Sequence, residues 1–272
     1  MQPPIVVAHL SDIHFGKIAH PGIVRALIDE VNALSVDLIA ISGDLTQRAR
    51  PHEYQAAAEM ISLFQAPTLV VPGNHDVYAW WHPIHRLVHP LGRYLRYVGR
   101  DLSPTFEGDG IAALGINSAH GRTVKGGRIG SAARASIASF FRAKEPATFK
   151  ILIVHHHLAR IQALGSHDVA RKAALTLQLA SDVGVDLILC GHLHVSHIHP
   201  LTLMPGRNPL VIASAGTATS SRGRASNRST NYYNVVRIDP TTFSIEERRF
   251  IPGEGRFASE QTTRFERATL DN

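Results

Sequence analysis

Five segments of this sequence place aspartate, asparagine or histidine directly after a short apolar run. They are HLSDIHFG, SGDLTQ, PGNHDV, HHHLA and GHLHVSH. Carboxylates, imidazoles and carboxamides suit iron, manganese, zinc or cobalt, whereas copper(I) and iron–sulfur clusters require sulfur ligands. The single cysteine, Cys190, excludes both a cysteine-ligated zinc site and an intrachain disulfide. These segments therefore predict metal binding through oxygen and nitrogen atoms.

Spacing indicates which of these side chains act together. In an extended chain, alternate residues point to the same side. Asp12 and His14 are therefore expected to reach one metal ion together, and His192 and His194 are expected to share a face. The next two histidines, at positions 197 and 199, would face the other way on a continued strand. We expect two of these four histidines to be ligands.

The elements that must position these residues follow from the apolar runs. Runs rich in valine and isoleucine predict strands over Ile5–Ala8, Leu38–Ile41, Leu69–Val71, Ile111–Ile116, Ile151–Val154, Leu187–Cys190 and Leu210–Ala213. Helical spacing follows Pro21 and Pro51, and further helices are predicted over Ser131–Arg142 and Val169–Ser181. Alternating strands and helices indicate an α/β fold, in which sites gather at the carboxyl ends of the strands.

We expect a single domain over residues 1–252. Residues 78–110 are an insertion with the character of a helical cap, because apolar residues recur in it at helical spacing. Period-two alternation predicts a C-terminal β-hairpin over residues 231–250. Residues 253–272 are expected to be a polar, irregular tail.

Composition bounds the class of protein. The 272 residues are 44% hydrophobic and 18% charged, which is typical of an ordinary globular protein. No stretch approaches the roughly 18 apolar residues of a membrane span, and the N-terminus carries no basic leader, so we expect a cytoplasmic protein. The formal charge of +6 favours anionic partners in general, without choosing among phosphate esters, nucleic acid and anionic lipid.

The five segments, taken in order, resemble the calcineurin-like metallophosphoesterases. That family's pattern is D-x-H, G-D, G-N-H-[DE], H and G-H-x-H, and each part of it is present. The stretches HLSDIHFG, GDLTQRARPHEY, PGNHDV, HHH and SAGTATSSRGR…NYYNVV are similar to the bacterial class III cyclic-nucleotide phosphodiesterases. The resemblance extends from His9 to about Val236 and implies a four-layer α/β/β/α sandwich of two mixed sheets flanked by helices, with two metal ions at the strand ends.

The resemblance also implies a role for each matching residue. Asp12, His14 and His194 would hold one ion, Asn74, His155 and His192 the other, and Asp44 would bridge them. The ions would be iron or manganese, with zinc and cobalt as alternatives. His75 would face the substrate and stabilise or protonate the leaving oxygen, and Asp76 would orient its loop.

The candidates for substrate contact are less specific. Trp80 and Trp81 lie close to His75 in sequence and could stack on a nucleobase, although a packed helix is the alternative interpretation of this segment. His157 has the same parity as His155 and could contact substrate. Arg222 lies in SSRGRASNRSTN, which is either a lip over an anionic substrate or a solvated loop.

The implied activity is hydrolysis of a phosphodiester by a hydroxide that bridges two metal ions. Two divalent ions, two aspartates and one hydroxide leave a net charge near +1, which matches one diester and does not exclude a monoester. Cyclic nucleotides (3′,5′ or 2′,3′) are the expected substrates. The alternatives are a phosphatase or pyrophosphatase acting on another ester, such as a nucleotide-linked lipid precursor, and a non-catalytic scaffold. Nothing points strongly to polymeric nucleic acid, and a homodimer is possible.

Overall fold

Two six-stranded sheets form the centre of the protein in a computed structural model that describes residues 3–161, 167–203 and 209–267. The strand order of the first sheet is β12 (Arg256–Glu266), β11 (Thr242–Ile251), β10 (Tyr232–Ile238), β1 (Ile5–Leu10), β2 (Leu38–Ile41) and β3 (Thr68–Val70). The order of the second is β4 (Thr105–Gly108), β5 (Ile111–Ile116), β6 (Phe149–Val154), β7 (Leu187–Cys190), β9 (Leu210–Ala215) and β8 (Ser196–Leu201).

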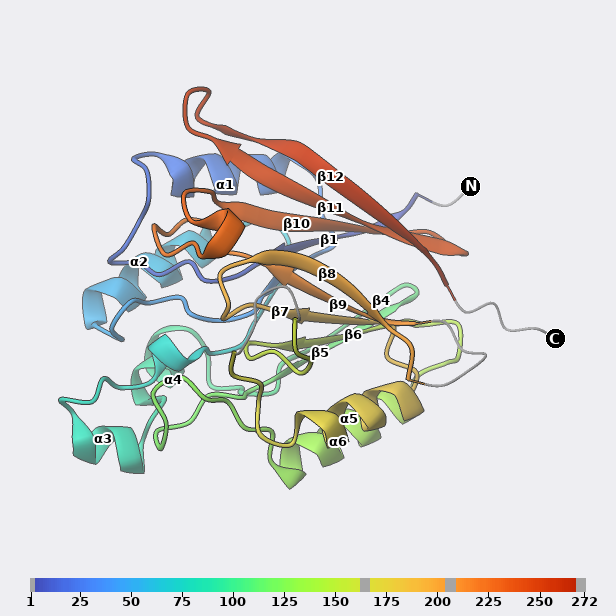
Figure 1. Ribbon diagram of the computed structural model, residues 1–272, viewed down its shortest axis with the longest axis horizontal. Coiled ribbons are helices and arrows are strands. Elements are labelled where there is room, and N and C mark those ends of the chain that lie inside the picture. Colours follow the sequence, from blue (N-terminus) through green and yellow to red (C-terminus); the bar gives the residue numbers. More distant parts are fainter. Residues whose placement is uncertain (1–2, 162–166, 204–208, 268–272) are drawn as a thin grey trace.

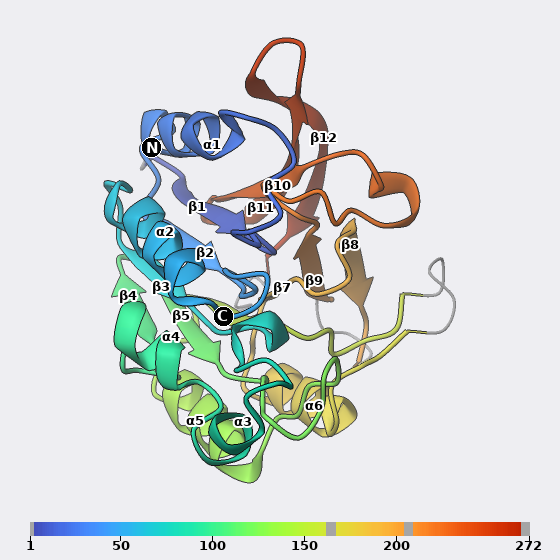
Figure 2. The ribbon, with the colours of Figure 1, turned by 90° about the vertical axis from the view of Figure 1, so that its left-hand side faces the viewer.

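Helices cover the outer face of each sheet, which gives four layers (Figures 1 and 2). Helices α1 (Ile23–Ala33) and α2 (Pro51–Ser62) pack on the first sheet. Helices α5 (Ser131–Arg142) and α6 (Ala173–Asp182) pack on the second. The predicted α/β/β/α sandwich of two mixed sheets is confirmed.

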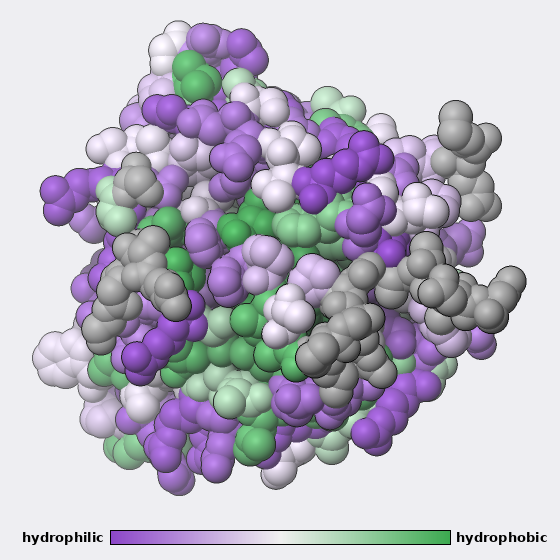
Figure 3. Space-filling view, turned by 45° about the vertical axis from the view of Figure 1, so that its right-hand side comes forward, coloured by the Kyte–Doolittle hydropathy of each residue, from purple (hydrophilic) through white to green (hydrophobic). Residues whose placement is uncertain are grey.

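Alternation along the central strands explains the layers. In β6, Ile151 points between the sheets and Leu152 points toward α5 and α6. In β1, Val7 likewise packs between the sheets, and Ala8 packs in the core under α1 and α2. Each fully buried aliphatic side chain contributes roughly 1.5–3 kcal/mol, so strands buried on both faces hold the two sheets together. On the face shown in Figure 3, hydrophobic residues gather in a band between hydrophilic upper and lower parts.

The polar tail is the first correction to the predicted organisation. Arg256–Glu266 are not irregular but form β12, which pairs antiparallel with β11. Phe257 is buried against Tyr233 and Phe250, and the ring of Phe265 stacks on that of Phe243. Most other residues of this edge strand are exposed, so the strand can be polar without loss of stability. The C-terminal hairpin is thus extended by a third strand.

The insertion at 78–110 is the second correction. Its apolar spacing predicts one helix, but the chain forms two short ones, α3 (Pro83–Val88) and α4 (Gly92–Tyr97), followed by β4. Pro90 separates them, because proline donates no backbone hydrogen bond and disfavours helical geometry in the residue before it. Tyr94 is buried, as the helical interpretation requires. Within the described ranges, no helix has both the length and the apolar character needed to cross a bilayer.

Candidate metal centre

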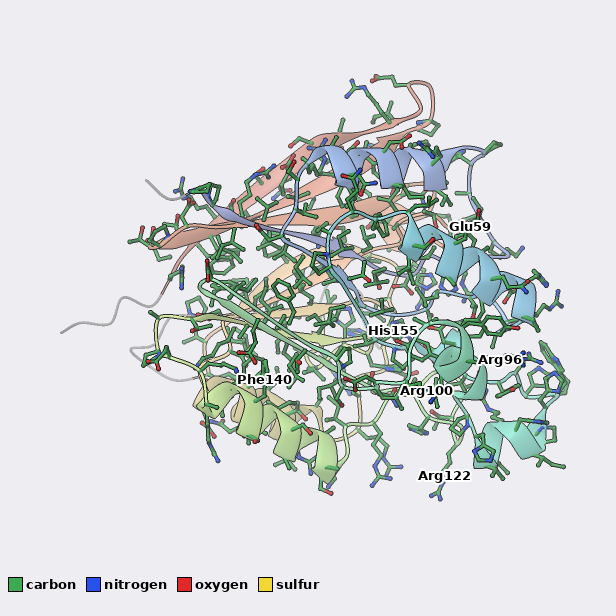
Figure 4. The ribbon with its side chains drawn as sticks, turned by 180° about the vertical axis from the view of Figure 1, so that it is seen from behind. Glu59, Arg96, Arg100, Arg122, Phe140 and His155 are labelled. Carbon is green, nitrogen blue, oxygen red and sulfur yellow. The ribbon has the colours of Figure 1, made fainter. Side chains whose placement is uncertain are left out.

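The loops that leave β1, β2, β3, β6 and β7 meet at one edge of the sandwich, the edge that faces the viewer in Figure 2. In Figure 4, His155 lies toward the same end of the molecule as α2 and α4. The seven predicted ligands lie on these loops, and their polar atoms form two adjoining clusters.

The first cluster joins two carboxylates and two imidazoles. Asp12 Oδ1 lies 3.0 Å from His194 Nε2 and 3.5 Å from His14 Nε2. The two Nε2 atoms are 3.2 Å apart, and Asp44 Oδ2 lies 3.5 Å from that of His14. The ligating atoms of all four residues lie within 4.8 Å of one another, which is close enough for one ion to contact them together.

The second cluster is centred on the amide oxygen of Asn74. This Oδ1 atom lies 2.9 Å from His192 Nδ1 and 3.2 Å from His155 Nε2. The Asn74 amide nitrogen donates to the carbonyl of Val124, which turns the oxygen toward the histidines. Asp44 Oδ2 lies 3.4 Å from His155 Nε2, so this one oxygen atom touches both clusters.

Three of the histidines are oriented by backbone carbonyls. Each uses Nδ1 as the donor, so that Nε2 presents its lone pair to the cluster. The pairs are His14 with Thr46 (3.1 Å), His155 with Ser42 (2.7 Å) and His194 with Arg222 (2.7 Å). The protein therefore fixes the tautomer that a metal ion requires.

Two buried carboxylate oxygens, Asp12 Oδ1 and Asp44 Oδ2, have no hydrogen-bond partner among the residues that the structure describes. The second oxygen of Asp12 accepts from the Ser11 hydroxyl and the His192 N–H, and that of Asp44 accepts from the His75 N–H. An unsatisfied buried acceptor costs about 1–3 kcal/mol, and more when it is charged. A cation at each cluster would satisfy these oxygens, so the residues present fit a metal centre.

The ionisation of the cluster favours cation binding. Burial acts to raise the pKa of Asp12, but His194 and His14 outweigh it and hold the pKa well below its usual range. The pKa of Asp44 is likewise low, because His155 and His75 overcome its burial. Burial lowers the pKa of His155, but the neighbouring Asp44 carboxylate outweighs this effect, and the pKa rises to about 9. A metal ion would displace that proton and take its place beside Asp44.

The backbone at this edge does not continue the strands, which corrects the alternation argument. Asp12, His14, Asp44, His192 and His194 all have positive φ angles, between 51° and 71°. This left-handed conformation costs non-glycine residues roughly 1–2 kcal/mol each. The predicted pairs do converge, but through strained turns rather than through the period of an extended strand. Strain of this kind is concentrated at functional sites.

Glycine is required at positions 73 and 191 because no side chain fits there. Gly73 has a φ of −102°, and neither residue is among those with positive φ. A Cβ atom on Gly191 would overlap Ser11 Oγ and Asp12 Oδ2, and one on Gly73 would overlap Asp44 Oδ1. The backbone must therefore pass directly against the carboxylates.

Gly191→Ala should displace Asp12 from the first cluster. We expect lower metal content and a loss of stability of about 1–3 kcal/mol, as is typical of overpacking. Metal analysis and thermal unfolding would measure both. Gly253→Ala is the matched control, because a Cβ there meets nothing within 4 Å. Equal metal content and Tm in the two variants would contradict this prediction.

His75 and Asp76 lie in a 3-10 turn, Asn74–Asp76, after β3. The ring of His75 donates from Nδ1 to the Gln47 carbonyl (2.8 Å) and contacts the His14 ring edge-on. Nε2 is thus the nitrogen available to a ligand in the adjoining cavity. Burial lowers the pKa of His75 to about 4, which keeps the free imidazole neutral.

Asp76 holds this turn in place. One oxygen accepts from the Thr46 N–H and hydroxyl, and the other accepts from the N–H groups of Gly73 and Leu45. The three bonds from Thr46 and Leu45 tie the loop after β3 to the loop after β2, and the bond from Gly73 closes the turn itself. They agree with the expected orienting role of Asp76.

Asp76→Asn should destabilise the fold by about 2–4 kcal/mol. The amide would turn an NH₂ group toward buried N–H donors and leave at least one of them unsatisfied. Denaturant unfolding at neutral pH measures the change, and Asp168→Asn, at an exposed carboxylate, is the comparison. An unchanged midpoint would show that Asp76 does not hold the loops together.

A cavity of about 580 Å³ opens over the two clusters. Its lining includes Asp44, Asn74, His75, His192, His194 and Arg222. A second cavity of about 200 Å³ adjoins it and shares Asn74, His75, Lys125 and Arg222. The two cavities together give a ligand at the clusters room to extend.

Two of the four predicted substrate contacts line the cavities, and two do not. Arg222 lines both cavities and donates to Gln47 Oε1, and Trp80 lines the second cavity. Trp81 is not among the residues that line either. His157 is a correction, because it is buried against Cys190 Sγ (3.6 Å) and away from both cavities. The chain bends after Val154, so the parity that relates His155 to His157 no longer applies.

His156 belongs to this site but was missed. Its ring centroid lies 4.6 Å from that of His192. One of its nitrogens lies within 4.8 Å of ligating atoms of His155 and His192. However, Nε2 donates to the Lys125 carbonyl and Nδ1 accepts from the Ser118 hydroxyl, so both nitrogens are already used within the protein. Three consecutive histidines give no signal in the sequence of which one turns inward.

Comparison with known proteins completes the description of the site. The chain is 30% identical to the 3′,5′-cyclic adenosine monophosphate phosphodiesterase CpdA of Escherichia coli (strain K12), over 58% of this chain and 54% of that protein. It is 33% identical to the glycerophosphodiester phosphodiesterase GpdQ of Enterobacter lignolyticus (strain SCF1), over 26% of this chain and 30% of that protein. The chain thus spans only about a third to a half of the length of these curated relatives.

The fold recurs in a solved structure. Purple acid phosphatase PPD1 from yellow lupin (Lupinus luteus) seeds superposes with a TM-score of 0.73 at 12% identity, over 98% of this chain and 54% of that one. Residues 5–196 match the calcineurin-like phosphoesterase family, which accounts for the five segments and the clusters they form. The chain therefore belongs to the calcineurin-like phosphoesterase family.

Proposed function

We propose that this protein is a metal-dependent phosphodiesterase that hydrolyses small cyclic nucleotides, with a 3′,5′ or a 2′,3′ linkage. The observation that carries the proposal is a pair of buried oxygens, Asp12 Oδ1 and Asp44 Oδ2, which have no hydrogen-bond partner within the described part of the chain and lie close to imidazole nitrogens beneath an open cavity. Such oxygens destabilise a structural core, whereas a metal centre requires them as ligands.

Asp12, His14 and His194 would hold one ion, Asn74, His155 and His192 the other, and Asp44 would contact both. When bound, a pair of ions supplies Lewis acidity toward a phosphoryl oxygen and makes a water nucleophile available near neutral pH. Iron and manganese suit this set of nitrogen and oxygen ligands. The identity of the metals, the homodimer and the cytoplasmic location stay predictions.

The protein's own groups surround the position of the phosphate. The Nδ1–H bond to the Gln47 carbonyl holds the His75 ring in place, so Nε2 can donate to the leaving oxygen only when the imidazole is protonated, which the negative charge of a bound phosphoester favours. Arg222 and Lys125 line both cavities and bring positive charge to the rim. Preorganised charges of this kind stabilise the negative charge that develops in the transition state.

Two observations support the substrate class, namely the shape of the two cavities and the similarity to a known phosphodiesterase. The two cavities offer room beyond the phosphate, and the Trp80 ring at the second one is a surface on which a nucleobase can stack. The likeness to CpdA favours a cyclic nucleotide. A nucleotide-linked lipid precursor is the second candidate, favoured by the exposed apolar residues of α3 close to Trp80. A non-catalytic scaffold is disfavoured, because every ligand position is filled.

A panel of esters tests the proposal. Protein loaded with Mn²⁺ should hydrolyse bis(p-nitrophenyl) phosphate and at least one cyclic nucleotide, and EDTA should abolish both activities. p-Nitrophenyl phosphate, which offers a monoester and the same chromophore, is the matched comparison. A preference for this monoester would contradict the diesterase assignment. Turnover that is insensitive to EDTA would contradict the metal centre.

A further inference from the structure

The short helix α3 buries none of its six residues. Ile84, Leu87 and Val88 are 74%, 67% and 62% exposed, and their spacing puts them on one helical face. Trp80, just before the helix, is 71% exposed. We call these four residues the α3 patch. Large side chains exposed together in this way usually mark a surface that contacts something apolar.

Contacts on the other side of α3 hold the α3 patch against the rest of the protein. Arg86 donates to the backbone carbonyls of Tyr78 and Thr123, which ties the helix to two neighbouring loops. The ring of His85 packs against that of Tyr78, with centroids 5.0 Å apart. The helix is therefore docked through its other side, and the apolar face points outward because the inward face is already used.

The sequence around the α3 patch carries positive charge only. No aspartate or glutamate occurs from Val77 to Arg100, whereas arginines stand at 86, 93, 96 and 100. Arg96 and Arg100, in and after α4, and Arg122 lie at the same end of the molecule in Figure 4 and are exposed. None of these three takes part in an ion pair among the residues that the structure describes. Asp101, which directly follows Arg100, accepts a hydrogen bond from the Ser103 N–H.

Three occupants can be weighed against this pattern. A second copy of the chain, related by two-fold symmetry, would place the α3 patch and its arginines against themselves, with like charges opposed. A nucleic acid would satisfy the arginines but would leave Ile84, Leu87 and Val88 without an apolar partner. An anionic bilayer satisfies both, because its acyl boundary receives aliphatic and tryptophan side chains while its headgroups attract arginine.

We propose that the α3 patch is a membrane-contacting surface that docks this protein reversibly on anionic lipid. Ile84, Leu87, Val88 and Trp80 would enter the interfacial region, and Arg96, Arg100 and Arg122 would lie at headgroup level. Trp80 also lines the second cavity, so the mouth of the site would open beside the lipid surface. Docking through Ile84, Leu87 and Val88 requires none of the metal ligands.

Tryptophan fluorescence gives a direct test, because the chain has only two tryptophans and both stand beside α3, at positions 80 and 81. The protein is mixed with vesicles of phosphatidylcholine alone or of phosphatidylcholine with phosphatidylglycerol. We expect a blue shift and co-sedimentation with the anionic vesicles only, both weakened by salt. No shift, or equal binding to both kinds of vesicle, would overturn the proposal.

Variants locate the surface. Ile84→Ser with Leu87→Ser should weaken vesicle partitioning at least about tenfold, since two apolar side chains lose their contact. Leu175→Ser, at a comparably exposed leucine of α6, should leave it unchanged. Arg96→Gln should weaken it about fivefold, as expected for one cation near an anionic surface. If the serine pair instead halves the solution mass in light scattering and vesicle binding is absent, the surface is a dimer interface and the proposal fails.

Discussion

Asp44→Asn should lower kcat/KM for a phosphodiester by at least about a hundredfold. Asp44 Oδ2 lies 3.5 Å from His14 Nε2 and 3.4 Å from His155 Nε2, so it stands between the two clusters. An amide in its place removes the negative charge that two cations would share. It also turns either a weaker acceptor or an N–H donor toward the histidines. We therefore expect both ions to bind less tightly.

Metal content and stability separate this effect from misfolding. The parent protein should bind about two Mn²⁺ ions per chain, and its Tm should rise as Mn²⁺ is added. In the variant, both the stoichiometry and the rise in Tm should fall. Asp37→Asn is the control, because Asp37 accepts from the Val6 N–H on the surface and an amide oxygen can do the same. A variant that keeps two ions and full activity would remove Asp44 from the metal centre.

The central strands could be predicted from the sequence because burial on both faces leaves an unbroken apolar run. β2, β5 and β7 begin and end at the residues expected. The edge strands β4, β8 and β12 were missed, because Phe257 is the only buried residue among them and each strand carries polar residues or proline. The sequence SHIHPL of β8 gives no apolar signal, although its partner β9 is fully buried. Pairing with a neighbour, rather than intrinsic hydrophobicity, forms these strands.

The site was predictable to the extent that strand ends converge. The loops after five buried strands had to meet at one edge, and the candidate ligands stand on them. What could not be predicted is the backbone conformation there, since left-handed turns at Asp12 and His192 are unfavourable locally and are imposed by the surrounding fold. For the same reason the sequence does not indicate that the Arg222 carbonyl orients His194, or that His156 packs beside His192. Such contacts depend on tertiary packing.

His75→Asn should leave the metal centre intact and still lower kcat by about 10²–10⁴-fold. The asparagine amide can replace Nδ1 as the donor to the Gln47 carbonyl, and the backbone N–H to Asp44 is unchanged. Only the ring edge that carries Nε2 is lost. Metal content and Tm should therefore match those of the parent, in contrast to Asp44→Asn.

Substrates with different leaving groups test whether His75 assists the departure of the leaving oxygen. p-Nitrophenolate departs without a proton, whereas the ribose oxygen of a cyclic nucleotide is a poor leaving group that needs a hydrogen-bond donor or a proton. If His75 holds the leaving oxygen, His75→Asn should damage cyclic-nucleotide hydrolysis far more than that of bis(p-nitrophenyl) phosphate. Asp44→Asn should damage both equally, because it acts on the metal centre. Equal losses in the His75 variant would mean that this histidine binds or orients the phosphate and does not assist departure.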